Sequence, residues 1–254
     1  LRRYLLDRHN RGLEDDLDSW IRMVATNRLT GHSAGFFSVY TLPPNQAVSP
    51  ERQDLINRRL RQKPTYRDTR ALMLRKTRSL LRNVTENQRR LLERAGRSAR
   101  FYRTDARRTR SIPAESVQLT VTSPPFLNVV NYAGDNWLRC WFNGLDAERV
   151  GRRLSIHSSL SDWSNVMASV FRELFRVTRT GGWVAFEVGE VRRGTIALDH
   201  TVAELGTAAG FTCIAILINT QRFTKTSRIW GIDNNRRGTN TNRIVLFQKS
   251  RVSN

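Results

Sequence analysis

Cysteine is almost absent from this sequence, histidine is rare, and long apolar runs are missing. Cys140 and Cys213 are isolated, so the 254-residue chain offers neither a disulfide framework nor a CxxC metal-binding knuckle. The four histidines have no ligand spacing such as HxxxH, and no metal site is predicted. No apolar run approaches the roughly 20 residues of a membrane-spanning helix, and the N-terminal LRRYLLDRHN lacks the apolar centre of a secretory signal. We therefore expect a soluble, cytoplasmic protein with no membrane segment.

Acidic residues and lysine are also scarce, and the sequence is strongly basic through arginine. Lys and Arg together number 43 against 22 Asp and Glu, which gives a net charge of +21. A polyanionic partner is expected, because each phosphate that a protein neutralises releases counterions. A GC-rich genome would explain arginine in place of lysine, but not the surplus of charge. Since no long basic helix has an aromatic apolar face, a nucleic acid is favoured over an anionic membrane as this partner.

Residues 1–98 read as a mainly helical, arginine-rich region. Four apolar residues recur at the spacing of one helical face: Leu17, Trp20, Ile21 and Val24. Further helices are expected at 51–62, 66–83 and 86–100, after a short β-like stretch at 35–45. Arginines on the polar faces of these helices are expected to contact DNA, with a solvated charged surface as the alternative. They are Arg59, Arg67, Arg70, Arg75, Arg78, Arg82, Arg89, Arg90 and Arg94.

From residue 99 to 254 the pattern changes to alternating strands and helices, which predicts an α/β catalytic portion. The expected strands are 100–106, 116–121, 181–191, 211–221 and 242–249, and the expected helices are 135–145, 161–177 and 199–210. Because no helix joins the last two strands, this order predicts a mostly parallel sheet with an antiparallel edge.

A stiff turn follows the strand at 116–121. Residues 122–126 read Thr-Ser-Pro-Pro-Phe, and ligands of open α/β sheets sit just beyond the carboxyl ends of strands. Neither proline has an N–H, and each pushes the preceding residue out of the helical region. Ser123 Oγ and the carbonyls of Ser123 and Pro124 are thus predicted to accept hydrogen bonds from the amine of a base, which makes that amine nucleophilic. Phe126 offers a face for stacking an extruded base, worth about 1–3 kcal/mol; an ordinary loop is the alternative.

Residues 122–126 resemble the TSPPY catalytic motif of S-adenosylmethionine-dependent DNA amino-methyltransferases, with phenylalanine in place of tyrosine. The run TDARRTRSIPAESVQLTVTSPPF is similar to the family's segment from GDA to TSPPY, and FRELFRVTRTGGWVAFEVGEV is similar to its RVLKPGG segment. The resemblance implies a class I, Rossmann-like sheet, S-adenosylmethionine as cofactor and base flipping. It also implies catalytic roles for Ser123, Pro124, Pro125 and Phe126. Serine at 123 favours cytosine N4, since relatives that methylate adenine N6 more often carry Asp or Asn there.

The resemblance also suggests residues around the motif that bind cofactor and base. Asp105 falls where the family places an acidic residue that contacts the adenine of the cofactor; a strand-end cap or an arginine partner is the alternative. Thr122 and Glu187 are also expected near the cofactor. The loop at 223–243 corresponds to one that walls the base pocket, with a polar hairpin as the alternative. Its candidate base-binding residues are Trp230, Asn234, Asn235, Asn240 and Asn242.

Two features of the family have no counterpart here. The FxGxG cofactor motif is absent, and so are the first two strands of the sheet, which lie in its middle. We therefore expect a missing N-terminal segment or another polypeptide to carry that motif, with residues 1–98 as an insertion that has a possible role in target recognition. The predicted function is site-specific methylation of cytosine N4, as in restriction-modification systems. The alternatives are adenine N6 methylation, a non-catalytic DNA-binding half of a split methyltransferase, and methylation of RNA or protein glutamine.

Overall fold

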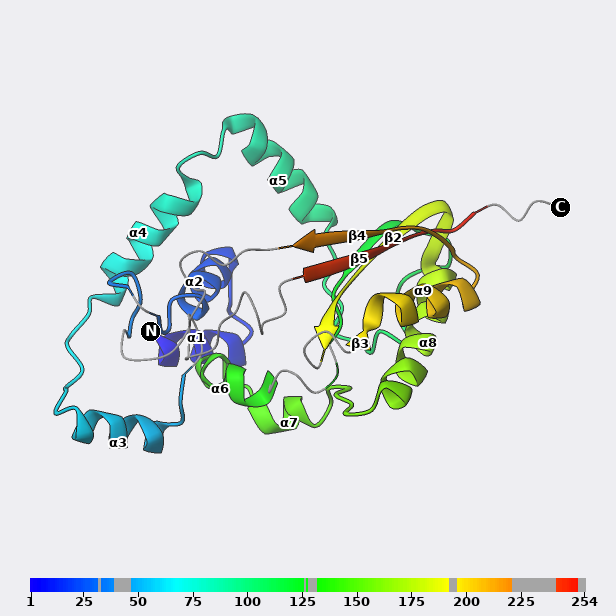
Figure 1. Ribbon diagram of the computed structural model, residues 1–254. Coiled ribbons are helices and arrows are strands. Elements are labelled where there is room, and N and C mark those ends of the chain that lie inside the picture. Colours follow the sequence, from blue (N-terminus) through cyan, green and yellow to red (C-terminus); the bar gives the residue numbers. More distant parts are fainter. Residues whose placement is uncertain are drawn as a thin grey trace. The chain divides into compact units, whose positions relative to one another are not determined.

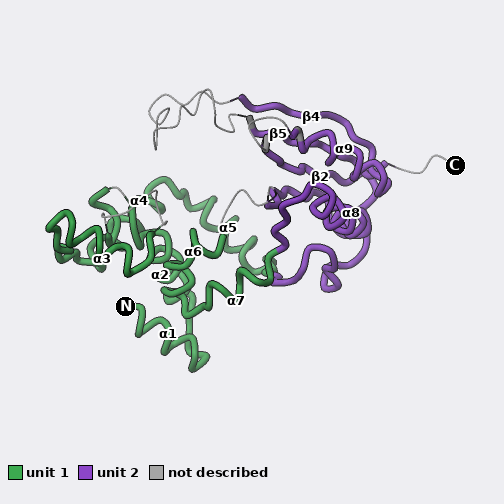
Figure 2. The backbone as a smooth tube through the Cα atoms, turned by 60° about the horizontal axis from the view of Figure 1, so that its bottom comes forward, with its two compact units in different colours: residues 1–101, 131–154 green, residues 102–130, 155–254 purple. Residues whose placement is uncertain are grey.

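The computed structural model describes residues 1–31, 33–38, 47–125, 127, 132–191, 196–220 and 241–250. The chain divides into two compact units: unit 1 comprises residues 1–101 and 131–154, and unit 2 comprises residues 102–130 and 155–254 (Figure 2). Residues 131–154, which the sequence pattern assigned to the catalytic portion, group with the N-terminal region. None of the helices in the described residues is long and apolar enough to cross a membrane.

Unit 1 is helical (Figure 1), and several of its helices begin at residues that suit a helix start. The helices are α1 (Arg2–Asn10), α2 (Asp16–Thr26), α3 (Pro50–Arg59), α4 (Thr69–Leu81), α5 (Glu86–Ser98), α6 (Tyr132–Phe142) and α7 (Ala147–Gly151). Asp15 and Thr85 form capping boxes at the starts of α2 and α5, and Ser49 and Pro50 start α3. The expected helices of this region are therefore present within slightly different limits, whereas the sequence pattern did not indicate α1 or α7.

The core of unit 1 is small. Leu5, Ala25, Leu29 and Phe142 are buried together, while α5 has no buried residue. The expected β-like stretch at 35–45 forms no strand in its described part, where Ser38 makes only an isolated bridge to Thr30; residues 39–45 lie outside the described residues. Burial therefore does not explain why α5 forms, and its capping box and its ion pairs between glutamate and arginine stabilise it locally.

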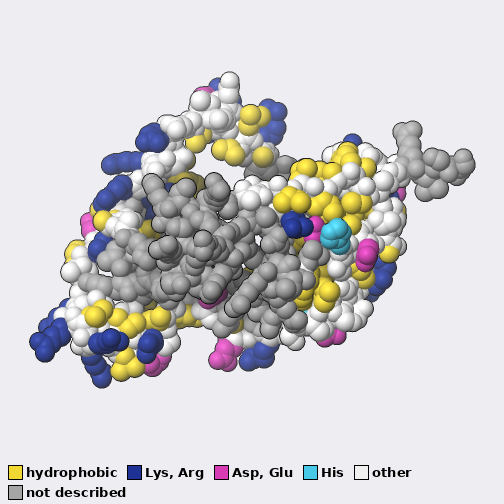
Figure 3. Space-filling model, viewed as in Figure 1, with side chains coloured by type: hydrophobic (Ala, Val, Ile, Leu, Met, Phe, Trp, Pro, Cys, Tyr) yellow, Lys and Arg dark blue, Asp and Glu magenta, His cyan; other side chains and the backbone are white. Residues whose placement is uncertain are grey.

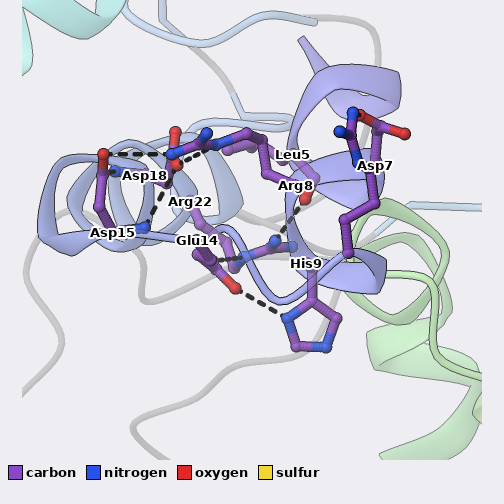
Figure 4. Close-up of polar contacts among 9 residues, drawn as sticks. Leu5, Asp7, Arg8, His9, Glu14, Asp15, Asp18 and Arg22 are labelled. Carbon is purple, nitrogen blue, oxygen red and sulfur yellow. Dashed lines mark hydrogen bonds and ion pairs between the residues drawn. The ribbon is translucent and has the colours of Figure 1, made fainter.

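An ion-pair cluster joins α1 to α2 and to the loop between them (Figure 4). Arg8 Nε lies 2.8 Å from Asp18 Oδ2, and Arg8 Nη2 lies 3.2 Å from Asp15 Oδ2. Arg22 Nε lies 2.6 Å from Glu14 Oε1. Asp18 is buried, and the hydrogen bond from Arg8 lowers the pKa of its carboxyl. Some arginines of this region therefore hold helices together rather than standing free for a partner.

Unit 2 is a sheet with helices, built from residues that alternate between strand and helix patterns. Its elements are β1 (Val117–Thr122), α8 (Leu160–Val177), β2 (Thr178–Val191), β3 (Ile196–Ala197), α9 (Leu198–Ala208), β4 (Thr212–Thr220) and β5 (Thr241–Gln248). The strand order is β1-β2-β5-β4, with β3 beside β2. β1 runs parallel to β2, and β5 runs antiparallel to both β2 and β4. The predicted α/β class is confirmed, and the strand directions agree with a Rossmann-like sheet that closes in an antiparallel edge pair.

α8 and α9 cover one face of this sheet. The ring of Phe171 in α8 lies 4.7 Å from that of Phe186 and 5.4 Å from that of Phe247, measured between centroids. Gly206 of α9 lies so close to Phe247 that a Cβ there would overlap the ring. The main core of unit 2 therefore lies between these helices and the strands, and one glycine lets α9 approach β5.

The opposite face of the sheet carries apolar side chains that no described residue covers. Leu119 and Val121 are paired in register with Trp183 and Ala185 of β2, on the face away from α8 and α9, and their exposed fractions are 56% and 74%. Leu217 of β4 is half exposed on the same face. Hydrophobic side chains are visible over the strands of unit 2 in Figure 3. Among the described strands, β1 also has a partner on one side only.

Two of the expected strands differ from those in the structure. The strand expected at 100–106 is not formed, and Phe101 within it is 96% exposed. A strand needs a partner for its backbone groups, and β1, the nearest in sequence, pairs only with β2 among the described strands. β2 begins at Thr178 rather than at 181, and Thr178 is already paired with Val117 of β1. Within the strand, Gly181 adopts a φ of +77° and its N–H donates to the carbonyl of Lys249 at 2.7 Å. The glycine pair therefore bends a continuing strand instead of starting one.

Candidate active site at the carboxyl edge of the sheet

The diproline turn leaves the sheet where β1 ends. Thr122, the last residue of β1, is in register with Phe186 of the parallel strand β2, so β2 continues beyond the point at which the chain turns away. Ser123 is exposed, while Pro124 and Pro125 are half buried. The turn is therefore accessible at the carboxyl edge of the sheet, where open α/β sheets bind ligands.

Two contacts fix this turn to the core. The indole Nε1 of Trp163, a fully buried residue of α8, donates to the carbonyl of Pro125 at 2.9 Å. Two residues later Leu127 is buried in the main core with a φ of +50°, a left-handed conformation that a leucine rarely adopts. Such a conformation persists where its surroundings over-determine it, often at functional sites. The position of the turn is thus set from both sides by buried groups.

Ser123 and Pro124 present acceptors that no described residue occupies. Ser123 Oγ makes no hydrogen bond to any described residue, and no turn or loop hydrogen bond of the described backbone uses the carbonyl of Pro124. The carbonyl of Pro125 is occupied by Trp163. Phe126, the expected stacking residue, lies outside the described residues. An exposed hydroxyl beside a free carbonyl on a rigid turn is able to hold a small donor such as a primary amine.

Two further predicted residues lie at this edge of the sheet. Glu187 follows Phe186 on β2 and lies on the sheet face away from α8 and α9, half buried. Asn242 of β5 is in register with Gly189, two residues further along β2 and on the same face. The structure therefore gathers Thr122, Ser123, Glu187 and Asn242 at one edge, from three adjacent strands.

The predicted base-binding loop begins and ends at the same edge. β4 ends at Thr220 and β5 begins at Thr241, and these two residues are in register as neighbours. Because β4 points in the same direction as β1, its end and the diproline turn share the carboxyl edge. Trp230, Asn234, Asn235 and Asn240 lie outside the described residues, so their roles stay predictions.

Asp105 is not brought to this edge. Its carboxylate forms a two-oxygen contact with Arg107, with distances of 3.0 Å and 2.6 Å for the two shortest pairs, and this partner lowers the pKa of the carboxyl. It lines a cleft with Glu173 of α8, ten residues beyond Trp163. At a rise of 1.5 Å per residue this is about 15 Å along the helix. Asp105 therefore lies far from the diproline turn and is paired with an arginine, which was the alternative to its expected contact with the cofactor.

A buried ion pair at the carboxyl edge was not indicated by the sequence. Arg243 Nη1 of β5 lies 2.8 Å from Asp199 Oδ2 in the first turn of α9, and Asp199 is 2% exposed. Arg243 is in register with Val188 near the end of β2, so the pair lies under α9 at the same edge as Ser123. The only signals were an arginine within an apolar strand and an acidic residue in a first helical turn; their proximity follows from the fold.

Comparisons with known proteins give weak likenesses only. No protein-family profile matches the chain, and no curated protein matches it. A structure of a putative DNA modification methylase from Thermus thermophilus, complexed with S-adenosyl-L-methionine, is 21% identical and superposes with a TM-score of 0.34 over 59% of this chain and 55% of that one. A SAM-dependent methyltransferase from Methanosarcina mazei is 13% identical, with a TM-score of 0.35 over 66% of this chain and 79% of that one.

The chain spans about half the length of the Thermus protein that it resembles. At such identities and TM-scores these likenesses do not determine what this chain does.

Proposed function

We propose that this chain is the base-binding part of an S-adenosylmethionine-dependent DNA methyltransferase that modifies the N4 amine of cytosine. The observation that carries the proposal is the exposed Ser123 on a diproline turn that Trp163 and Leu127 fix at the carboxyl end of β1. Ser123 Oγ and the carbonyls of Ser123 and Pro124 accept hydrogen bonds from the amine of a flipped cytosine. Pro125 keeps the turn rigid, and Phe126 stacks on the base.

Positioning supplies most of the rate in this mechanism. Hydrogen bonds from both amine hydrogens draw the nitrogen lone pair out of conjugation with the ring and aim it away from the acceptors. S-adenosylmethionine supplies the methyl group that the nitrogen accepts. The surplus amine proton leaves to water, and the protein forms no covalent bond to the base. The rigid turn matters because a nucleophile held about 1 Å out of place loses on the order of 100-fold in rate.

We infer that the described residues supply only part of a site for S-adenosylmethionine. Asp105 lies at the other end of α8 and is paired with Arg107, while Thr122 and Glu187 remain beside the turn as proposed cofactor neighbours. We propose that further polypeptide, either an upstream segment or another chain, supplies the FxGxG loop. One edge of β1 has no partner among the described strands, and this edge and the exposed side chains of Leu119 and Val121 offer this polypeptide a strand partner and an apolar surface.

Double-stranded DNA is the proposed partner, and the arginine-rich helices of residues 1–98 are proposed to take part in target recognition. α4 and α5 support this assignment, because they expose many arginines and bury only one residue, Leu72, between them. Arginine-phosphate pairing favours such surfaces on DNA. A protein with this charge is expected to associate with the nucleoid, and a restriction enzyme is the expected counterpart of a site-specific modification activity.

Nucleoside analysis of cellular DNA tests the proposal. The gene with its natural flanking reading frame is expressed in a host that lacks DNA methylation, and the DNA is digested and analysed by mass spectrometry. We expect N4-methylcytosine with the wild-type sequence and none with Ser123→Ala. The control is Ser98→Ala, because the Ser98 hydroxyl bonds only to carbonyls of its own helix. N6-methyladenine instead would establish the adenine alternative, and unmodified DNA from a protein that still binds DNA would establish the non-catalytic one.

A further inference from the structure

A basic cleft lies on the outer side of α8, away from the core of unit 2. It has a volume of about 570 Å³ and is lined by Asp105, Arg107 and Arg108 of a loop and by a stripe of α8. The stripe consists of Ser169, Arg172, Glu173 and Arg176. Arg172 and Glu173 are adjacent, and each lies three or four residues from Ser169 and from Arg176, so the four side chains project from one face of the helix.

The loop is clamped onto the helix by one ion pair. Glu173 Oε1 accepts from the backbone N–H of Thr109 at 2.6 Å and from its hydroxyl at 2.7 Å. Arg176, which lies 2.7 Å from the same oxygen, donates to the carbonyl of Ile112 at 3.0 Å. The Arg176 guanidinium holds the pKa of Glu173 at about 2, so this clamp stays charged near neutral pH. The wall of the cleft is therefore held in place before any ligand arrives.

Two guanidinium groups of the cleft have no carboxylate partner among the residues that the structure describes. Arg107 is neutralised by Asp105, and Arg176 by Glu173. Arg172 Nη2 donates only to the hydroxyl of Ser169, at 2.9 Å. Arg108 is exposed, and no described carboxylate forms an ion pair with it or with Arg172. Arginine forks pair with the two oxygens of a phosphate, so an anion with paired oxygens fits the unneutralised part of the cleft.

We propose that this cleft binds a phosphate group of the DNA backbone, at a second contact point remote from the diproline turn. The inference rests on the proposed action on DNA. Arg172 lies nine residues beyond Trp163, about 14 Å along α8. Since DNA rises about 3.4 Å per base pair, this distance corresponds to about four base pairs. A phosphate contact there fixes the register of the protein on the duplex and does not read sequence.

Salt-dependent binding to a short duplex tests this assignment. Each phosphate contact contributes about 0.9 to the slope of log K against log salt. Because the cleft is proposed to hold one phosphate, the double variant Arg108→Ala/Arg172→Ala is expected to lose about 0.9 from that slope and about tenfold in affinity near 0.1 M salt, equally for all sequences. Arg149→Ala/Arg153→Ala, which removes two arginines around α7, is the control for net charge. The variant Arg108→Lys/Arg172→Lys keeps the charge without the fork and is expected to recover only part of the affinity.

The outcomes separate this inference from the proposed function. A wild-type protein that does not bind DNA would contradict the proposed function itself. Equal losses for the cleft variant and the control would overturn the cleft assignment while leaving DNA as the partner. Inorganic pyrophosphate is titrated in parallel. If it binds tightly to the wild type and not to the cleft variant, while both bind DNA equally, the cleft serves a small anion and the DNA assignment is wrong.

Discussion

Replacing Trp163 tests most directly whether the diproline turn must be rigid, because the indole of Trp163 donates a hydrogen bond to that turn. Trp163→Phe removes the donor to the Pro125 carbonyl and leaves that half-buried acceptor unpaired. An unsatisfied group of this kind costs about 1–3 kcal/mol, and the space left by the smaller ring adds a cavity term. We expect unit 2 to remain folded with a lower unfolding temperature, and the turn to become mobile.

The rate of methyl transfer should fall by more than the loss of stability alone would cause. Hydrogen exchange of the peptide that contains Leu127 should become faster, and methyl transfer at saturating DNA should fall by on the order of 100-fold, because the acceptors drift from the amine. Trp137→Phe is the matched control. It removes a comparable hydrogen bond in unit 1, in which the indole Nε1 of Trp137 donates to the carbonyl of Ala47 at 2.7 Å. Equal rates of methyl transfer in the two variants would refute the claim that this anchor positions the turn.

Three further predictions follow from particular contacts. Gly206→Ala should destabilise unit 2 by about 1–3 kcal/mol in urea unfolding, because the new methyl group overlaps Phe247; an unchanged midpoint would mean that α9 does not pack as described. The folded pKa of Glu173, about 2, lies below that of an unfolded glutamate, so its pairing stabilises the fold above about pH 4–5 and is lost as the pH falls toward 2. In Glu173→Gln, the unfolding temperature should depend less on pH between about pH 5 and pH 2. A pH profile identical to that of the wild type would contradict the claim that Glu173 stabilises the fold through its ion pair. Residues 1–254 alone should bind S-adenosylmethionine weakly or not at all in calorimetry, whereas micromolar binding would show that no further polypeptide is needed.

Periodicity predicted the elements whose stability is local. Trp163, Val166, Val170 and Leu174 follow the spacing of one helical face, and α8 forms there with its N-cap at Ser159. The apolar runs before the diproline and at the chain's end likewise form β1 and β5. α8 carries both its start signal and its buried face in the sequence, so its limits are predictable to within a few residues.

Features that depend on distant partners were not predictable in the same way. The strand expected at 100–106 has the right residue types, but a strand forms only when its backbone groups pair with a neighbouring strand, and no described strand pairs with this segment. Asp105 looked like a site residue because of its place in a motif, yet Arg107, two positions away, takes its carboxylate. Asp199 and Arg243 are 44 residues apart, and their pairing depends on β5 lying beside β2 under α9. Local patterns carry no information about such contacts.

Photo-crosslinking tests the central claim, that a flipped base lies against the diproline turn. A duplex that carries 5-iodocytosine at the target position is irradiated with the protein, and the crosslinked peptide is identified by mass spectrometry. We expect the crosslink within residues 122–127, and we expect Ser123→Ala to reduce its yield while total DNA binding is unchanged. Crosslinks confined to the arginine-rich helices of unit 1, with none at the turn, would contradict the account.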